Sequence, residues 1–333
     1  MRKFMRSCLD AFKSNLIIII IFSLVLAAET YELDYSVYSP GGLINVANRL
    51  DNIPYDSSGS FNITYVSYRK GTLMNLLIAK ILPNYDIIEN SDILIPDEDL
   101  VDLNNREKLQ IQQSLTGAYY VAYHKANKQI DIKYEDDYIY YVYNKEDNKL
   151  RVGDKLLKCD GRDIANFNDL GICIDSFNEN DIVTLTVERN KKTIDVPAKV
   201  YLDEEEKRIG VIVTKIYNYD LDPKINYKYD KNESGGSGGL MLALTLYNSL
   251  VEEDITHGKK IAGTGTIDLY GDVGEISGVK YKLAGAVKKK ADAFIVPEAN
   301  YDEAIEVKEK NNYSIKIIKA TNFEQVLNEL NNI

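Results

Sequence analysis

Hydrophobic and polar positions change their spacing several times along the chain, and each spacing predicts a type of element. Apolar and polar residues alternate in SGSFNITYVSYRKGTL (58–73), the pattern of a half-buried strand. Helical spacing follows over 73–82 and again over 106–126, where Leu109, Gln112, Leu115 and Tyr119 recur at helical intervals. The C-terminal third then alternates helix and strand patterns, which predicts a domain of the α+β or α/β type.

Turn signals divide the middle of the chain. The stretch QIDIKYEDDYIYYVYN (129–144) predicts two strands joined by an acidic turn. Gly153 and Gly161 mark turns in the segment that follows, and residues 182–200 predict a strand, a turn and a strand. Residues 260–276 predict a hairpin. Thr321 and Glu324 have the spacing of a capping box at the start of the last helix.

The N-terminal segment combines a basic run with LIIIIIFSLVLAA (16–28). A membrane-spanning helix needs about 20 apolar residues, so this segment is short. The same pattern fits a signal peptide that is cleaved near Ala28, and the pattern alone does not choose between anchor and signal. In both cases the basic residues stay inside and the body is exported, so Cys8 should face the cytoplasm.

Charge and composition exclude several classes of function. The chain has 40 basic and 51 acidic residues, a net charge of −11, which disfavours nucleic-acid binding. Cys159 and Cys173 lie in apolar runs and are expected to be buried free thiols. With only His124 and His257 and no zinc-type spacing, we expect no metal and no other cofactor.

The stretch ESGGSGGLMLALTLYNSL (233–250) places Ser237 among glycines and leads into an apolar helix. It fits either a flexible linker or a tight turn that presents a nucleophile at the start of a helix. A serine needs a base, and Lys282 in GVKYKLAGA lies in an apolar helical stretch that could keep it neutral. Taken alone, a lysine on a helix is more often a solvated charge.

Four segments together resemble the proteolytic domain of Lon-type Ser–Lys peptidases: the glycine stretch, then KKIAGTGTI, GDVGEISGVKYKLAGA and AFIVPEAN. The resemblance implies that Ser237 is the nucleophile, Lys282 the general base, and Thr264 a partner that hydrogen-bonds the lysine. Gly236 and Gly238 flank the serine where the family usually has Pro and Ala, and they are expected to support the loop.

Residues 150–192 resemble a PDZ domain of the bacterial protease type. With the N-terminal apolar segment and the Lon-type segments, nearly the whole chain resembles the membrane-anchored PDZ–Lon proteases of Gram-positive bacteria. This implies an α+β fold with an inserted PDZ domain and an N-terminal transmembrane helix. The expected domains are a cytoplasmic tip and membrane anchor (1–30), the first part of the peptidase domain (31–127), the PDZ domain (128–202) and the catalytic part (203–333).

The resulting prediction is a single-pass membrane protein with its N-terminus in the cytoplasm and an extracellular serine endopeptidase domain. No G-x-x-x-x-G-K-[ST] motif occurs, so we expect no ATP requirement. Expected partners are peptide or protein substrates and the membrane, and a homo-oligomer is left open. The rivals are an inactive PDZ scaffold that binds extracellular peptides and a soluble binding protein with a signal peptide.

Overall fold

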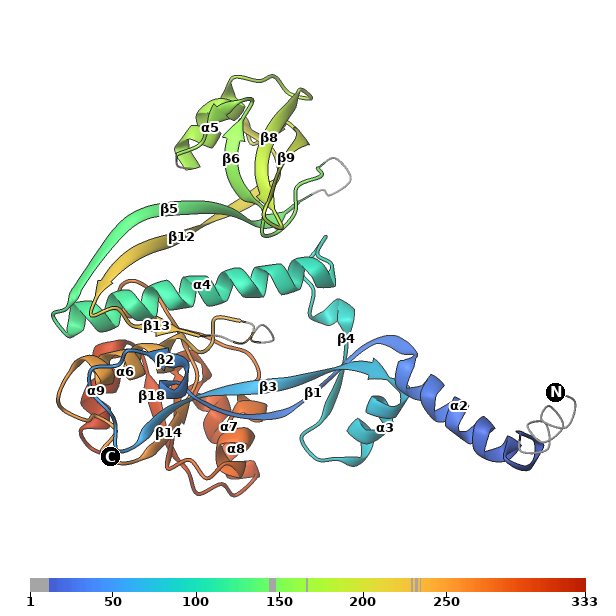
Figure 1. Cartoon of the computed structure of the whole chain (residues 1–333), viewed down its shortest axis with the longest axis vertical. Coiled ribbons are helices and arrows are strands. Elements are labelled where there is room, and N and C mark those ends of the chain that lie inside the picture. The colour runs from blue at the N-terminus through green and yellow to red at the C-terminus, as the bar shows by residue number, and fades with distance from the viewer. Residues whose placement is uncertain (1–11, 144–147, 166, 229, 231–232, 234) are drawn as a thin grey trace, which may run out of the picture. The chain divides into compact units, whose positions relative to one another are not determined.

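A computed structural model describes residues 12–143, 148–165, 167–228, 230, 233 and 235–333 (Figure 1). These residues form two compact units. One unit contains the described residues up to Gly41 together with Val66–Ile93, and the other contains Gly42–Tyr65 and Leu94–Ile333. Cys8, predicted to face the cytoplasm, lies outside the described residues.

The smaller unit contains α2 (Leu16–Thr30), α3 (Leu73–Ile81) and β4 (Asp86–Glu89). Strand β4 pairs in antiparallel fashion with β1 (Glu32–Asn45). The predicted helix at 73–82 is confirmed, and the sequence explains its start: the Thr72 hydroxyl accepts a hydrogen bond from the Asn75 amide, at 3.2 Å, in the manner of an N-cap.

Helix α2 covers the apolar N-terminal segment and has 15 residues. A helix that crosses the hydrocarbon core of a bilayer needs about 20. In the part of the chain that the structure describes, no helix is both long and apolar enough to cross a membrane. The transmembrane helix predicted within 1–30 is therefore not confirmed.

The main sheet has six strands in the order β18-β17-β14-β3-β1-β4. Its further strands are β3 (Ser60–Thr72), β14 (Lys260–Gly263), β17 (Ala293–Pro297) and β18 (Lys316–Ala320). Strand β14 pairs in parallel with β3 and β17, and β17 pairs in parallel with β18. All of β17 is buried, as its unbroken apolar sequence predicts for a strand covered on both faces.

Helices cover both faces of the parallel strands. Ile261 and Ile295 pack in one core with residues from α4 (Leu100–Lys125), α6 (Gly239–Leu250) and α9 (Phe323–Leu330). Phe294 and Val296 point the other way, into a core shared with α7 (Val279–Lys288) and α8 (Tyr301–Lys310). Helices and strands are therefore mixed as predicted, but this part is a layered α/β arrangement rather than α+β.

One local prediction here is confirmed only in part, and another is wrong. Of the hairpin expected over 260–276, only β15 (Thr266–Ile267) and β16 (Val273–Gly274) pair with each other; the preceding β14 joins the main sheet, because its apolar residues are buried there. Helix α9 is capped by Asn322 rather than Thr321, since the Asn322 side chain accepts from the Gln325 amide at 2.9 Å.

A second sheet has the order β12-β5-β6-β8-β9, with β7 beside β6. Its elements are β5 (Gln129–Val142), β6 (Lys155–Cys159), β7 (Arg162–Asp163), α5 (Phe167–Asp175), β8 (Ile182–Arg189), β9 (Lys192–Lys199) and β12 (Val211–Asp222). The predicted pair at 182–200 is confirmed as β8 and β9. The short remaining elements are η1 (Ala47–Arg49), β2 (Leu50–Asp51), η2 (Asn90–Asp92), β10 (Tyr201–Asp203), β11 (Glu206–Arg208), β13 (Asn226–Tyr227) and η3 (Glu298–Asn300).

Strand β5 corrects the prediction of two strands and an acidic turn at 129–144. It is one strand, paired with β12 from Gln129↔Asp222 to Val142↔Val211, and the two form the long curved ribbon in Figure 1. The acidic residues stay in the strand because β12 supplies backbone partners along it and places Lys215 opposite Asp137.

The free thiols expected at Cys159 and Cys173 are also a wrong prediction. The two cysteines, 14 residues apart, form a disulfide between β6 and α5. Both are buried in the core of the second sheet, where the packing of α5 against β6 brings them together. Buried free thiols and a disulfide leave the same apolar pattern in the sequence, so only the fold distinguishes them.

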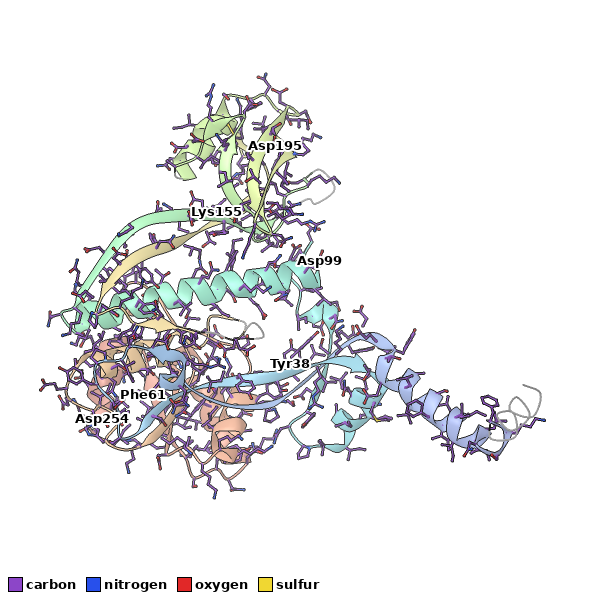
Figure 2. The ribbon with its side chains drawn as sticks, viewed as in Figure 1. Tyr38, Phe61, Asp99, Lys155, Asp195 and Asp254 are labelled. Atoms are coloured by element: carbon purple, nitrogen blue, oxygen red, sulfur yellow. A yellow bond between two sulfur atoms is a disulfide. The ribbon has the colours of Figure 1, made fainter. Side chains whose placement is uncertain are left out.

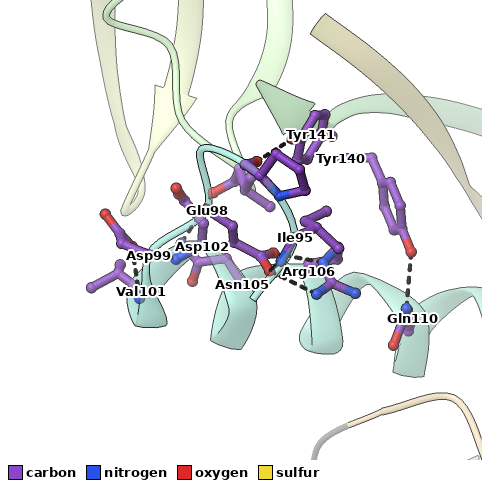
Figure 3. A network of polar contacts seen from close by, with 12 residues as sticks. Ile95, Glu98, Asp99, Val101, Asp102, Asn105, Arg106, Gln110, Tyr140 and Tyr141 are labelled. Carbon is purple, nitrogen blue, oxygen red and sulfur yellow. Dashed lines mark hydrogen bonds and ion pairs between the residues drawn. The ribbon is translucent and has the colours of Figure 1, made fainter. Parts of the chain in front are cut away.

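Helix α4 begins at Leu100, before the predicted start at 106, because polar contacts secure its first turns (Figure 3). The Asp99 side chain caps it, accepting from two amides at 2.8 and 2.9 Å. Arg106 donates to both carboxylate oxygens of Glu98 at 2.6 and 2.8 Å, the forked geometry of a strong ion pair. The same helix supplies Leu109 to the core of the second sheet and Tyr119 to that of the main sheet.

Candidate active site

Ser237 lies in a turn directly before α6 and is half-buried. Every residue of α6 except Tyr247 is buried, as expected for a helix that is apolar on all sides. This burial fixes the helix and so fixes the end of the chain segment that carries Ser237. The structure thus supports the turn-and-helix interpretation of 233–250 over a flexible linker.

The glycines around Ser237 allow the loop to lie against α4. Gly235 has φ +80°, a left-handed conformation that glycine adopts without strain. A Cβ on Gly239 would stand 2.0 Å from the Ser114 hydroxyl of α4, so any side chain there would clash. The Ser114 hydroxyl donates to the Gly236 carbonyl oxygen at 2.6 Å, and this bond holds the serine loop against α4. Gly238, at the N-cap of α6, completes the turn.

Thr264 connects the serine loop to the end of β14. Its hydroxyl donates to the Ser237 carbonyl oxygen at 3.1 Å, and the Gly265 amide donates to the same oxygen at 2.7 Å. The Thr264 side chain is fully buried. Strand β14 lies inside the main sheet, between β17 and β3. These two hydrogen bonds therefore hold the backbone of Ser237 in a fixed position relative to that sheet.

Lys282 lies on α7 with only 4% of its surface exposed. Its Nζ donates to the Thr264 hydroxyl at 3.1 Å. Burial lowers the pKa of Lys282 to about 8, against an opposing effect of Glu303. The cause is the one that the apolar sequence around the lysine predicts: an ammonium group loses its hydration when apolar neighbours enclose it.

Together these contacts form a chain from Lys282 through Thr264 to Ser237. Among the hydrogen bonds of the described residues, the link between lysine and serine runs through Thr264 rather than directly. Since Thr264 gives its proton to the Ser237 carbonyl, its oxygen is left to accept from Lys282. A neutral Lys282 that donates one N–H in this way keeps its lone pair for a proton from another group.

Across the described residues, no three or more His, Cys, Asp and Glu side chains are grouped so that they could hold a metal ion. Ser237, Thr264 and Lys282 do not themselves form a metal-ligand set of the usual kind. A buried amine linked through Thr264 to the serine loop can take part in the transfer of a proton to or from a hydroxyl.

Residues 230–332 match the family described as the Lon protease (S16) C-terminal proteolytic domain. The chain contains a Lon-type proteolytic domain. Among its relatives, the archaeal Lon protease of Halobacterium salinarum is 26% identical over 132 residues, which cover 39% of this chain and 19% of that protein. The Lon protease of Helicobacter pylori is 27% identical over 184 residues, 53% of this chain and 22% of that protein. The chain spans about a fifth of the length of these curated relatives.

The PDZ domain of the SdrC-like protein from Listeria monocytogenes is a match among solved structures. It covers 25% of this chain and 92% of its own, at 18% identity and a TM-score of 0.23. A TM-score this low carries no argument about the fold, so the PDZ domain expected at 128–202 stays a prediction.

The Lon-type domain contains all five residues predicted for the site, and the fold gathers them around one loop: Ser237, Lys282, Thr264, Gly236 and Gly238. Their catalytic roles stay predictions.

Sequence reasoning missed two residues of this region. Ser114 holds the serine loop, and no signal in the sequence distinguishes it from other polar residues of α4. Glu303 raises the pKa of Lys282 from α8, and it looks like any exposed glutamate of an amphipathic helix.

Proposed function

We propose that the chain is a serine endopeptidase in which Ser237 is the nucleophile and Lys282 the general base. The observation that carries this proposal is the buried Lys282, whose lowered pKa makes the neutral amine accessible near physiological pH. Its hydrogen bond to Thr264, which also bonds the Ser237 carbonyl, keeps the amine beside the serine loop. The Lon-type proteolytic domain supports the same reaction.

In the proposed reaction, the Ser237 hydroxyl attacks the carbonyl carbon of a peptide bond as its proton moves to Lys282. The tetrahedral intermediate then breaks its C–N bond, and Lys282 returns the proton to the leaving amine. Water hydrolyses the acyl-enzyme by the same route in reverse. The amides of Ser237 and Gly238 make no hydrogen bond within the described part of the chain, so they are our candidates to stabilise the oxyanion.

We further propose that this reaction needs neither metal nor nucleotide. Serine and lysine supply both the nucleophile and the base, and the sequence contains no Walker A motif. Adding ATP and magnesium should therefore leave the rate of peptide cleavage unchanged. A large stimulation by ATP would point to a nucleotide site or to an essential partner.

Residues 1–30 are proposed to anchor the protein with its N-terminus inside and its body outside the cell. The basic run before Leu16 favours this orientation. The disulfide between Cys159 and Cys173 supports an oxidising location for the body, because disulfides are rare where glutathione keeps thiols reduced. Protease added to wall-free cells should digest the body and spare the N-terminus. Release into the medium with a new N-terminus near Ala28 would show a signal peptide instead.

The catalytic proposal is tested with the full chain in detergent and a library of internally quenched peptides. Ser237→Ala and Lys282→Ala should each abolish cleavage and leave the fold intact by circular dichroism. Matched controls are Ser249→Ala, a buried serine of helix α6, which follows the Ser237 turn, and Lys288→Ala, an exposed lysine at the end of α7. Near-normal turnover of Lys282→Ala would exclude the Ser–Lys mechanism.

Peptides and exposed protein segments outside the cell are the proposed substrates. Comparison of the secreted peptides from cells that carry the parent chain or Ser237→Ala would identify them. Peptide binding with no cleavage by the parent chain would favour the inactive PDZ scaffold.

A further inference from the structure

An open cleft lies in the second sheet, where β6 separates from β5. It has a volume of about 410 Å³ and is lined by residues 135–137 of β5, 155–158 of β6 and 163–165 at the end of β7 and just after it. Lys155, labelled in Figure 2, stands at the start of β6 and pairs with Tyr138. This is the one registered pair between β5 and β6 in the described residues, and no other strand among them pairs with β5 on this side from 137 back to 129.

Asp137 is the unusual residue of this cleft. Only 6% of its surface is exposed, and its Oδ1 has no hydrogen-bond partner among the described residues. Burial raises the pKa of Asp137, and the nearby carboxylates of Glu135, Asp136 and Asp169 raise it further. Lys215, opposite on β12, acts against this, but its Nζ makes an ion pair with Glu135 at 2.6 Å. A buried carboxyl oxygen without a partner is costly, so its retention calls for an explanation.

The other charges of the cleft are already paired. Lys155 contacts Asp136 at 2.7 Å, and Lys158 contacts Asp163 at 2.9 Å. Both ammonium groups that line the cleft are thus engaged, whereas its lining includes four carboxyl groups. The cleft therefore has an excess of negative charge, and its most buried carboxyl group, that of Asp137, has one oxygen without a hydrogen-bond partner among the described residues.

We propose that this cleft binds the ammonium or guanidinium group of a lysine or arginine side chain in an extended peptide, with Asp137 as its partner. The edge of β5 on the cleft side can pair with the peptide backbone as an added strand. Alternate side chains of such a strand point to the same face, so one basic side chain can reach Asp137. A bound cation would also return the pKa of Asp137 toward its ordinary value.

Two other ligands fit the cleft less well. A C-terminal carboxylate would meet like charges from Asp137 and its acidic neighbours. A metal ion would need a group of ligands that the described residues do not provide. The role of the bound peptide as a substrate rests on the proposed peptidase function, whereas the binding itself does not.

The test uses the full chain in detergent with Ser237→Ala, so that the peptide is not cleaved. The probes are fluorescein-labelled, C-terminally amidated decapeptides of alternating Thr and Val with lysine, arginine or norleucine at one central position. Fluorescence anisotropy should give Kd values at least about tenfold lower for lysine and arginine than for norleucine. Asp137→Asn should remove this preference. Asp131→Asn, an exposed aspartate of the same strand, should keep it.

Thermal unfolding separates binding from a structural role. Asp137→Asn removes a buried charge that lacks a partner, so its Tm should equal or exceed that of the parent. A lower Tm with an unchanged preference for lysine would show that Asp137 serves the fold and would overturn the proposal. Equal binding of the lysine and norleucine peptides by the parent, or tighter binding of a free C-terminal carboxylate, would also overturn it.

The binding proposal and the peptidase proposal fail in different ways. Selective binding of lysine peptides by a chain whose Ser237 is intact but cleaves nothing would refute the peptidase and support the cleft. Cleavage that depends on Ser237, without any binding preference for lysine or arginine, would refute the cleft and support the peptidase.

Discussion

The rate of peptide cleavage should follow the titration of Lys282. Only the neutral amine can accept the Ser237 proton, and the pKa of Lys282 is lowered to about 8. The neutral fraction is then about 10% at pH 7 and about 90% at pH 9, so kcat/KM should rise roughly tenfold and level off above pH 9. An unperturbed lysine, with a pKa near 10.4, would still be gaining activity at that pH.

Glu303→Gln tests the physical origin of this midpoint. Glu303 raises the pKa of Lys282, so removal of its charge should move the midpoint to lower pH and increase the rate at pH 7. The plateau rate should not change, because the neutral lysine is the same base in both proteins. Glu303 is exposed, so salt should weaken its influence, and the shift should be largest at low ionic strength.

The assay measures kcat/KM for one quenched peptide from pH 6 to pH 10 at low and high salt. Glu306→Gln is the matched control, because it removes a glutamate from the same helix α8 without an assigned effect on Lys282. A profile that is highest in acid would refute Lys282 as the base. A midpoint near 10 would refute the argument that burial lowers its pKa. A midpoint that moves upward in Glu303→Gln would refute the sign of the interaction.

Three further predictions concern stability. Lys282→Met should raise the free energy of unfolding at pH 7 by about 3 kcal/mol, because folding lowers the pKa of the lysine from 10.5 to about 8. Urea titrations should show this gain in stability fade from pH 8 to pH 10.5, and a variant less stable than the parent at pH 7 would contradict the prediction. Gly239→Ala should force the Ser114 hydroxyl out of its bond to the serine loop and lower the free energy of unfolding by about 1 kcal/mol or more. The double variant with Ser114→Ala should lose less stability than the sum of the two single variants, and strict additivity in this double-mutant cycle would count against the clash. Replacing Cys159 and Cys173 together by serine should destabilise the second sheet by about 3 kcal/mol in the chain-entropy account, and scanning calorimetry with and without reductant would reveal no difference if the thiols were free.

Local sequence patterns were sufficient to predict elements that can be recognised from their own residues, without knowledge of the distant segments that pack against them. Helical spacing predicted α3 and most of α4, and the unbroken apolar run of β17 is typical of a strand covered on both faces. The Lon-type segments indicated Ser237, Thr264 and Lys282 as one constellation, and the apolar neighbours of Lys282 indicated why its pKa would fall. These inferences need only residues that are close in sequence or a known order of motifs.

Tertiary structure decided what depends on partners far along the chain. Strand β5 continues through its acidic residues because β12 pairs with it. Strand β14 joins the parallel sheet because its apolar residues become buried when it pairs with β3 on one side and β17 on the other. Ser114 reaches Gly236 across 122 residues of sequence, and Cys159 meets Cys173 only because α5 packs on β6. Composition and periodicity describe one segment at a time, whereas a hydrogen bond, a disulfide or an unpaired carboxyl group such as Asp137 is defined by what the fold brings beside it.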